Sequence, residues 1–386
     1  MKKFIRFFIL LVFAFVLKAN AQDSSRLRIS LLTCTPGNDL YSIFGHSAIR
    51  IVDSNNVNDL VFNYGTFNFN DEEFYIKFVK GKLNYFVSVQ QTEDFIYSYT
   101  AEGRGVTEQV LNLSEQEKNN IKRALIENLK EENKYYQYDF FYDNCTTRLR
   151  DIISKNKQPN PILPYVMPEK TRFRQAIHMY LNKSEQHWSK LGIDLLLGAK
   201  TDKIMSAEEQ EFLPENLMNA FDHCTNQKLV SEKVQLSPPT FINQISKSLF
   251  TPNFCFWIFF SIVLFLSFVK NKFISIIASG LDFTILFFTG ALGILFIFMW
   301  FGTDHIMTKN NYNILWALPT NLIAAFFIKS KLNFVRNYFV FITCFLSLVL
   351  ICWNFLPQQL NVSLIPIILS LMVRSYCFIS QKVNLK

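Results

Sequence analysis

From Asn253 onward the chain consists largely of Phe, Ile and Leu, arranged in five apolar stretches. These stretches lie near 253–269, 281–301, 313–328, 338–356 and 362–379, and several are long enough to cross a bilayer as helices. Pro319 and Pro366 interrupt the third and the fifth, and Arg374 lies within the fifth. The pattern predicts an all-α transmembrane domain of five helices over residues 251–386.

Basic residues between these stretches alternate by side. If all five stretches cross the membrane, the clusters at 270–272, 329–336 and 382–386 share one side, and the positive-inside rule places residues 22–250 on the other. Residues 1–21 combine an N-terminal basic cluster, a short apolar run and a small-residue cleavage site, as signal peptides do. We therefore expect residues 22–250 to form an exported domain.

The formal net charge of +8 comes from the signal peptide and from residues 251–386, not from the exported part. Residues 251–386 hold nine Lys and Arg against two Asp, and the signal peptide holds four more basic residues. The exported part is therefore slightly acidic, which excludes the basic surface that a nucleic-acid partner would need.

The exported part has the patterns of an α+β domain. Ser114 and Glu117 form a capping box at the start of an amphipathic helix. One face of the helix predicted over 169–182 carries Arg172, Arg174 and His178. We expect this face to be solvated, with contact to anionic lipid as the alternative. The residues after this helix are expected to form a helical or irregular connection to the membrane. Strands are predicted over 28–33, 47–52, 59–64 and 83–89, and helices over 74–79, 144–155 and 169–182, besides the helix from Ser114.

Cys145 is the strongest candidate for a nucleophile. Asp143 and Asn144, both good N-cap residues, precede it, and apolar residues at helical spacing follow it. A thiol at a helix N-terminus lies beside unpaired backbone N–H groups, which lower its pKa and can hold an oxyanion. A buried cysteine that only fills space is the alternative, so the assignment depends on a base.

His46 supplies that base. It stands at the start of a predicted strand, directly after Gly45, where another backbone or a substrate can approach closely. Together, His46 and Cys145 predict a Cys/His pair for acyl transfer. Cys34 and Cys224 are the other exported cysteines, and a disulfide between them would leave Cys145 free. We find no spacing typical of a metal site, and we expect no cofactor.

Several separated motifs resemble known proteins. GHSAIRI followed by DNCTTRLRD is similar to the permuted papain-like (NlpC-like) fold, in which a strand histidine precedes an Asn-Cys helix. TCTPGNDLYSIFGHSAIR, VFNYGTFNF and FVKGKLNYF resemble the exported domain of the Lnb-type lipoprotein N-acyltransferases, whose membrane domain has five helices. The resemblance implies an inner (cytoplasmic) membrane protein of bacteria, multi-pass, with its N-terminal domain in the periplasm.

The resemblance also implies an activity. Such enzymes take an acyl chain from a membrane phospholipid, hold it as a cysteine thioester and place it on the α-amine of a diacylglyceryl-cysteine lipoprotein. Read onto this chain, Cys145 is the nucleophile, His46 the base and Asn63 the residue that orients the imidazole. Arg50, Arg148, Tyr41 and His305 are the candidates for substrate binding.

Two other function classes stay open. A membrane-tethered periplasmic cysteine peptidase or amidase acting on cell-wall peptides would use the same pair of residues. It would be active without the membrane helices, and five spans are more than an anchor needs. A non-catalytic membrane scaffold would tolerate replacement of Cys145 by serine.

Overall fold

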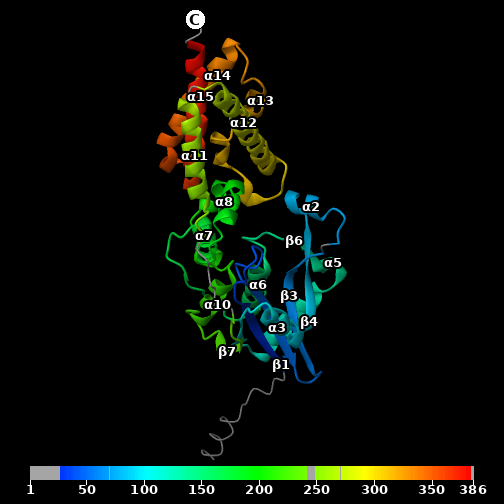
Figure 1. Ribbon diagram of the computed structural model, residues 1–386. Coiled ribbons are helices and arrows are strands. Elements are labelled where there is room, and N and C mark those ends of the chain that lie inside the picture. Colours follow the sequence, from blue (N-terminus) through cyan, green and yellow to red (C-terminus); the bar gives the residue numbers. More distant parts are fainter. Residues whose placement is uncertain (1–26, 69, 241–247, 270, 384–386) are drawn as a thin grey trace, which may run out of the picture.

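The computed structural model describes residues 27–68, 70–240, 248–269 and 271–383. It has an N-terminal sheet-rich α+β domain followed by a helical C-terminal region, as predicted (Figure 1). The predicted signal peptide, residues 1–21, lies outside the described residues.

One antiparallel sheet of seven strands, in the order β6-β4-β3-β2-β1-β5-β7, forms the centre of the exported domain. Strands β1 and β2 are buried along most of their length, and β3 in its middle, because helices cover both faces of the sheet. The strand bounds are β1 Leu27–Cys34, β2 His46–Asp53, β3 Asn58–Thr66, β4 Asn84–Gln91, β5 Val106–Leu111, β6 Tyr135–Gln137 and β7 Val230–Ser237.

Two helical layers sandwich this sheet. Helices α4, α6 and α10 pack on one face, where Leu149 and Ile153 of α6 join Ile29 and Ile49 of the sheet in one buried cluster. Helix α3 packs on the other face, with Phe95 fully buried. The helices of this domain are α2 Phe74–Lys80, α3 Thr92–Ala101, α4 Glu115–Asn128, α5 Glu131–Lys134, α6 Cys145–Asn156, α7 Phe173–Lys183, α8 His187–Leu196, α9 Ala207–Gln210 and α10 Pro214–Asp222.

The predicted strands and helices of the first 183 residues are confirmed, and the capping box of Ser114 and Glu117 begins α4. The expectation for the residues after α7 was wrong in one respect. Strand β7 is not a connection, because it pairs with β5 and completes the edge of the sheet. Its residues Ser231, Glu232 and Lys233 are consecutive and exposed, as polar residues of edge strands commonly are, so the strand lacks the apolar alternation by which strands are predicted.

Within the described part of the membrane region, three helices are long and apolar enough to cross a bilayer: Lys272–Phe301, Asn333–Ile351 and Val362–Ser380. The first predicted span is the shorter apolar helix α11, Pro252–Phe268. The third is a 3-10 turn at Tyr312–Leu315 followed by the short α13, Thr320–Phe326, because Pro319 interrupts it. The remaining helices are α12 Lys272–Phe301, α14 Asn333–Ile351 and α15 Ile365–Val383.

Arg374, the charged residue within the last span, lies against Asp282 of α12. Its Nε and Nη2 atoms donate to the two carboxylate oxygens at 2.5 and 2.8 Å, and both side chains are buried. A paired charge of this kind ties two apolar helices together, because breaking it would leave either partner unpaired away from water.

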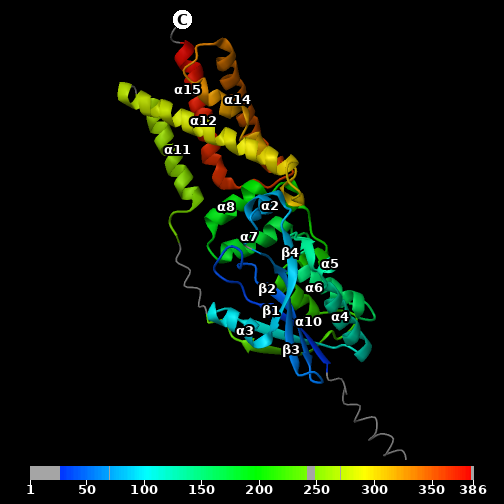
Figure 2. The ribbon, with the colours of Figure 1, turned by 90° about the vertical axis from the view of Figure 1, so that its right-hand side faces the viewer.

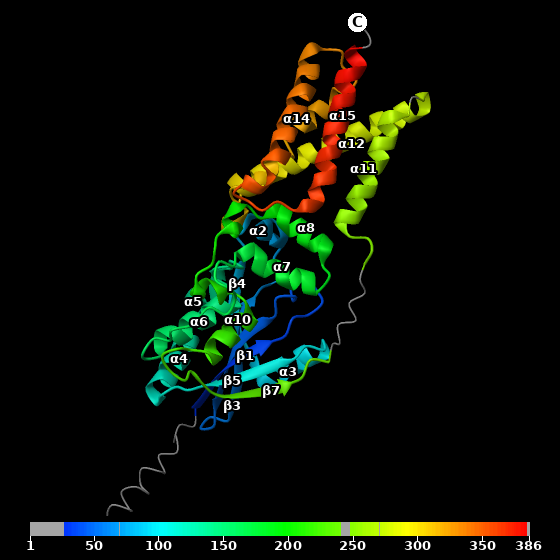
Figure 3. The ribbon, with the colours of Figure 1, turned by 90° about the vertical axis from the view of Figure 1, so that its left-hand side faces the viewer.

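The exported and membrane domains meet through α7 and α8, which lie between the sheet and the apolar helices (Figure 3). Leu191 of α8 belongs to the apolar cluster of the membrane helices, and Met307 of the membrane region belongs to the cluster around α7. Each domain therefore contributes to the other's core, and the loops of the membrane domain are held against the exported one.

Candidate active site

Cys145 is the first residue of α6, as the sequence predicts. Asn144 is its N-cap: the Oδ1 atom accepts the N–H groups of Thr146 and Thr147 at 2.8 and 2.9 Å. The Nδ2 group of Asn144 donates to the carbonyls of Phe140 and Phe212 at 2.7 and 2.8 Å, which fixes the start of the helix against two loops. The cap therefore places the thiol rigidly, and the N–H of Cys145 is the remaining donor of this turn.

His46 begins β2, the strand on which α6 packs. Gly45 before it has φ +82°, and a Cβ there would lie 2.8 Å from the carbonyl oxygen of Cys34, so only glycine fits. The neighbouring strand β3 carries Asn63, whose Oδ1 lies 2.6 Å from His46 Nε2. The structure thus brings Asn63 against the imidazole, and Nδ1 is the ring nitrogen left for the thiol.

Cys145 and His46 perturb each other's titration. Burial raises the pKa of the thiol, but the positive charge of His46, its hydrogen bond and the Ser47 N–H outweigh burial and lower the pKa of Cys145 to about 7. Burial likewise lowers the pKa of His46, while the Cys145 thiolate and the hydrogen bonds to Cys145 and Asn63 raise it to a net value above the ordinary one. The pair therefore favours thiolate and imidazolium near neutral pH.

Two tyrosines that sequence reasoning missed complete the surroundings. Tyr99 of α3 stacks on the His46 ring at 6.1 Å between centroids and 11° between planes, and Arg104 lies over Tyr99. Tyr138 lines the cavity beside Cys145, with both next to Gly65. Neither tyrosine has a local sequence signal, because each reaches the site only through tertiary packing.

Cys145 and His46 open into a cavity of about 550 Å³. Residues 305–308, from the loop after α12, form part of its wall, so the cavity is shared between the exported and the membrane domain. Tyr41 and His305, two of the predicted substrate-binding residues, line it, and His305 Nε2 lies 3.1 Å from the carbonyl oxygen of Phe78. Most of the wall is apolar and includes Phe44, Phe67, Phe78, Tyr85, Phe140 and Phe212.

The two predicted arginines lie away from this cavity. Arg50 is held by Asp59, with its Nε atom 2.7 Å from Oδ1, and by Glu108 at 3.1 Å. Arg148 pairs with Asp143 at 2.6 Å, and its guanidinium lies 3.5 Å from the centre of the Tyr136 ring. Both guanidinium groups are thus engaged by carboxylates of the exported domain, and we do not assign them to the substrate.

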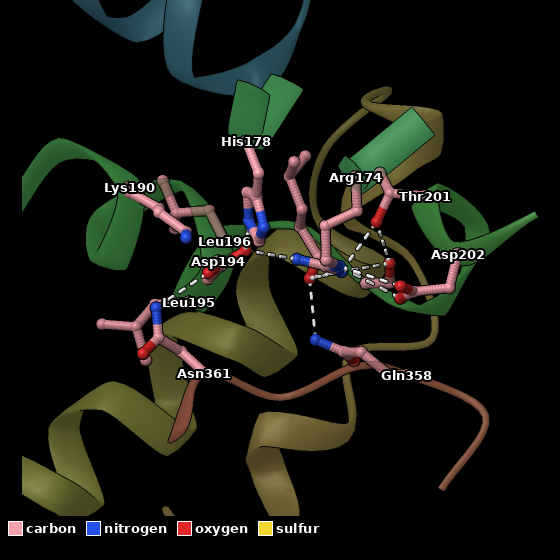
Figure 4. A network of polar contacts seen from close by, with 12 residues as sticks. Arg174, His178, Lys190, Asp194, Leu195, Leu196, Thr201, Asp202, Gln358 and Asn361 are labelled. Atoms are coloured by element: carbon pink, nitrogen blue, oxygen red, sulfur yellow. Dashed lines mark hydrogen bonds and ion pairs between the residues drawn. The ribbon is translucent and has the colours of Figure 1, made fainter. Parts of the chain in front are cut away.

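Arg174 and His178 do not form the solvated face that we expected. Arg174 is 1% exposed and donates to Asp194 at 2.8 Å, Asp202 at 3.0 Å and Thr201 at 2.7 Å (Figure 4). His178 Nε2 lies 2.8 Å from the same oxygen of Asp194. Burial raises the pKa of Asp194, but His178 and Arg174 outweigh it and hold that pKa below its usual value.

The same network joins the exported domain to the membrane domain. Asn361, which precedes α15, donates to Asp194 Oδ2 at 2.8 Å, and Gln358 donates to the carbonyl of Leu197 at 2.8 Å (Figure 4). Asn311 donates to the carbonyl of Leu195 at 2.6 Å. These bonds hold loops of the membrane domain against α8. The N–H of Gly198 donates to the carbonyl of Met307 at 2.8 Å, so residues 305–308 close one side of the cavity.

Cys34 and Cys224 are both free, so the structure does not contain the disulfide that we considered between them. Cys34 is buried in β1, where burial raises the pKa of its thiol strongly, whereas Cys224 follows α10 and is partly exposed. Cys145 is likewise free, and its pKa is lowered where that of Cys34 is raised.

Two family models match the chain. The first, described as the Lnb N-terminal periplasmic domain, matches residues 17–167 and so includes His46, Asn63 and Cys145. The second, described as the Lnb transmembrane domain, matches residues 244–384. No curated protein and no solved structure gives a significant match. The two matches together cover most of the chain, in the order expected from the motifs.

Proposed function

The chain belongs to the Lnb family, and we propose that it is a lipoprotein N-acyltransferase, which moves an acyl chain from a membrane phospholipid to the α-amine of a diacylglyceryl-cysteine lipoprotein. One observation carries the proposal: a thiol with a lowered pKa, beside an oriented histidine, opens into an apolar cavity shared by the exported and membrane domains. Such walls suit an acyl chain, whereas a cell-wall peptide would need polar groups along them.

In the first half-reaction, His46 accepts the proton of the Cys145 thiol through Nδ1, since Asn63 holds Nε2. The thiolate attacks the ester carbonyl carbon of the phospholipid, and the C–O bond breaks. His46 returns the proton to the departing oxygen of the lysophospholipid. The acyl chain remains on Cys145 as a thioester.

In the second half-reaction, the neutral amine of the lipoprotein attacks the thioester carbonyl carbon. One amine proton passes to His46 as the C–S bond breaks, so an amide forms and Cys145 leaves as a thiolate beside the imidazolium. A thioester is more reactive toward amines than an oxygen ester, so two moderate barriers replace one high barrier. The N–H of Cys145 is the donor placed to stabilise the oxyanion in both steps.

Substrate contacts belong to the residues that line the cavity. We assign Tyr41 and His305 to the substrate, because both lie in the cavity wall and come from the two different domains. His305 would be positioned by its contact with the Phe78 carbonyl rather than by a catalytic partner.

Mass spectrometry of a lipoprotein N-terminus tests this function. Cells whose lipoproteins remain diacylated would express the intact chain, Cys145→Ala or His46→Ala. We expect one additional acyl chain with the intact protein and none with either variant. Cys344→Ala is the matched control, because Cys344 is an exposed cysteine of α14, and it should behave like the intact protein. A diacylated N-terminus in cells with correctly inserted intact protein would refute the proposal.

A further inference from the structure

Helix α2 exposes an unusual amount of apolar surface for part of an exported domain. Tyr75 is 81% exposed, Ile76 56% and Val79 43%, and α2 has no buried residue among its seven. Lys77 and Lys80 share the side of the helix that these three do not occupy. An amphipathic segment of this kind is unfavourable in water unless something apolar covers it.

The position of α2 indicates what covers it. The loop that follows α12 binds directly to α2: the N–H of Asp304 donates to the carbonyl of Lys80 at 2.9 Å. His305 Nε2 lies 3.1 Å from the carbonyl of Phe78. Helix α12 ends only three residues before Asp304, at Phe301, which is 75% exposed. All views place α2 at the end of the exported domain that faces the apolar helices (Figure 2).

Helix α2 is also continuous with the cavity. Phe74 packs against Phe67 and Phe78, with ring centroids 5.7 and 6.2 Å apart. Phe67 and Phe78 both line the cavity that contains Cys145, so a row of aromatic rings leads from the surface of α2 to the candidate active site. Leu40, Tyr41 and Ile306, which also line the cavity, are exposed large apolar residues too.

We propose that α2 lies in the interface of the periplasmic leaflet of the membrane, with Tyr75, Ile76 and Val79 among the acyl chains, and that the cavity opens to the lipid beside it. The partner is thus a lipid surface rather than another protein. We choose a lipid surface because α2 is hydrogen-bonded to the loop that follows the outer end of the membrane helix α12. Lys80, on the other side of α2, suits the phosphate level of such a surface, whereas Lys77 is paired with Asp71 at 2.9 Å. That the lipid entering there is the acyl donor rests on the proposed function.

Photo-crosslinking from Ile76 tests the location. The full-length protein, with benzoylphenylalanine in place of Ile76, would be reconstituted in vesicles of phosphatidylethanolamine and phosphatidylglycerol, irradiated and analysed by mass spectrometry. The control carries the same group at Ile126 of α4, an isoleucine of similar exposure, 49%. Helix α4 lies farther from the apolar helices than α2 does (Figure 2). We expect phospholipid adducts at position 76 and none at position 126.

Equal labelling at both positions, or the absence of lipid adducts at position 76, would overturn the proposal. In native membranes, crosslinks from position 76 to protein alone, without any lipid adduct, would also overturn the proposal. Because crosslinking needs no turnover, the Cys145→Ala background gives the same readout, and a failure of the acyltransferase proposal would leave this result unaffected.

A kinetic comparison tests the role in donor access. Ile76→Asp should raise the apparent KM for a vesicle phospholipid donor about tenfold, with kcat changed less than twofold, and Ile126→Asp should change neither. A loss of kcat without a change in KM would contradict access from α2. Adducts at position 76 with no KM effect would show that α2 touches lipid but that the donor enters elsewhere, which overturns the second half of the proposal.

Discussion

Asn63→Ala is expected to slow acyl transfer by roughly 5- to 150-fold. Asn63 holds His46 through one side-chain contact of 2.6 Å between Oδ1 and Nε2, at a site closed over by Tyr99. Leaving a buried donor without its partner costs about 1–3 kcal/mol. Since each 1.4 kcal/mol is about a factor of ten in rate, that loss gives the range above if the whole cost falls on the reactive orientation of the imidazole.

The assay is the initial rate of lipoprotein acylation by purified full-length protein in vesicles, followed by the mass of the lipoprotein N-terminus. Asn128→Ala is the matched control, because Asn128 also makes one side-chain contact, to the Tyr64 hydroxyl at 2.7 Å, but lies outside the cavity wall. Asn63→Ala at a rate within twofold of the intact protein would refute the orienting role, provided that its thermal unfolding is unchanged.

Three further predictions follow from the same contacts. Alkylation of Cys145 by iodoacetamide should be half-maximal near pH 7, because its lowered pKa populates the thiolate at lower pH. In His46→Ala the midpoint should move to higher pH, since only the hydrogen bonds from Ser47 and Thr146 then oppose burial; an unchanged midpoint would contradict the ion pair. Arg174→Met should destabilise the protein by about 3–5 kcal/mol, because it leaves the buried Asp202 without its ion-pair partner and Asp194 with His178 alone, and a thermal shift would measure it. Gly45→Ala should move the midpoint of Cys145 alkylation to higher pH, because its Cβ would clash with the carbonyl oxygen of Cys34 and the resulting backbone shift would move the adjacent His46.

The local features of the site could be predicted from the sequence. Asn144 and Cys145 lie next to each other, and an N-cap followed by apolar residues at helical spacing is a signal contained within a few residues. His46 has a similar local signal, a glycine before a strand. Asn63 came from the resemblance, which implies an orienting residue on the strand after that of His46, and β2 and β3 are neighbours in the sheet.

The rest depends on contacts between distant parts of the chain. Arg174 looks like a solvated residue because its partners, Asp194 and Asp202, follow 20 and 28 residues later and come from other elements. A charged residue on an amphipathic helix is usually exposed, and only the tertiary structure shows that its charge is compensated. The same holds for Arg50, whose partner Glu108 comes from β5, a strand not predicted.

The membrane region shows the same limit. Composition locates the apolar stretches but does not decide which become long helices. Pro319 at the start of α13 leaves a seven-residue helix where a continuous span was predicted, and close contacts of Gly290 with Leu322 and of Gly293 with Ala317 bring this segment against α12. Packing between helices therefore sets the form of the third stretch, and the number of crossings stays a prediction.

The most direct test of the account is the mass of the intact protein after incubation with phospholipid in the absence of an acceptor. We predict the addition of one acyl chain on Cys145. Neutral hydroxylamine should remove this chain, as it does a thioester. A diacylated lipopeptide with a free α-amine should accept it as an amide. Cys145→Ala should gain no mass under the same conditions. Transfer to the lipopeptide without an acyl-enzyme, or an acyl group that remains on Cys145 when the lipopeptide is added, would contradict the account.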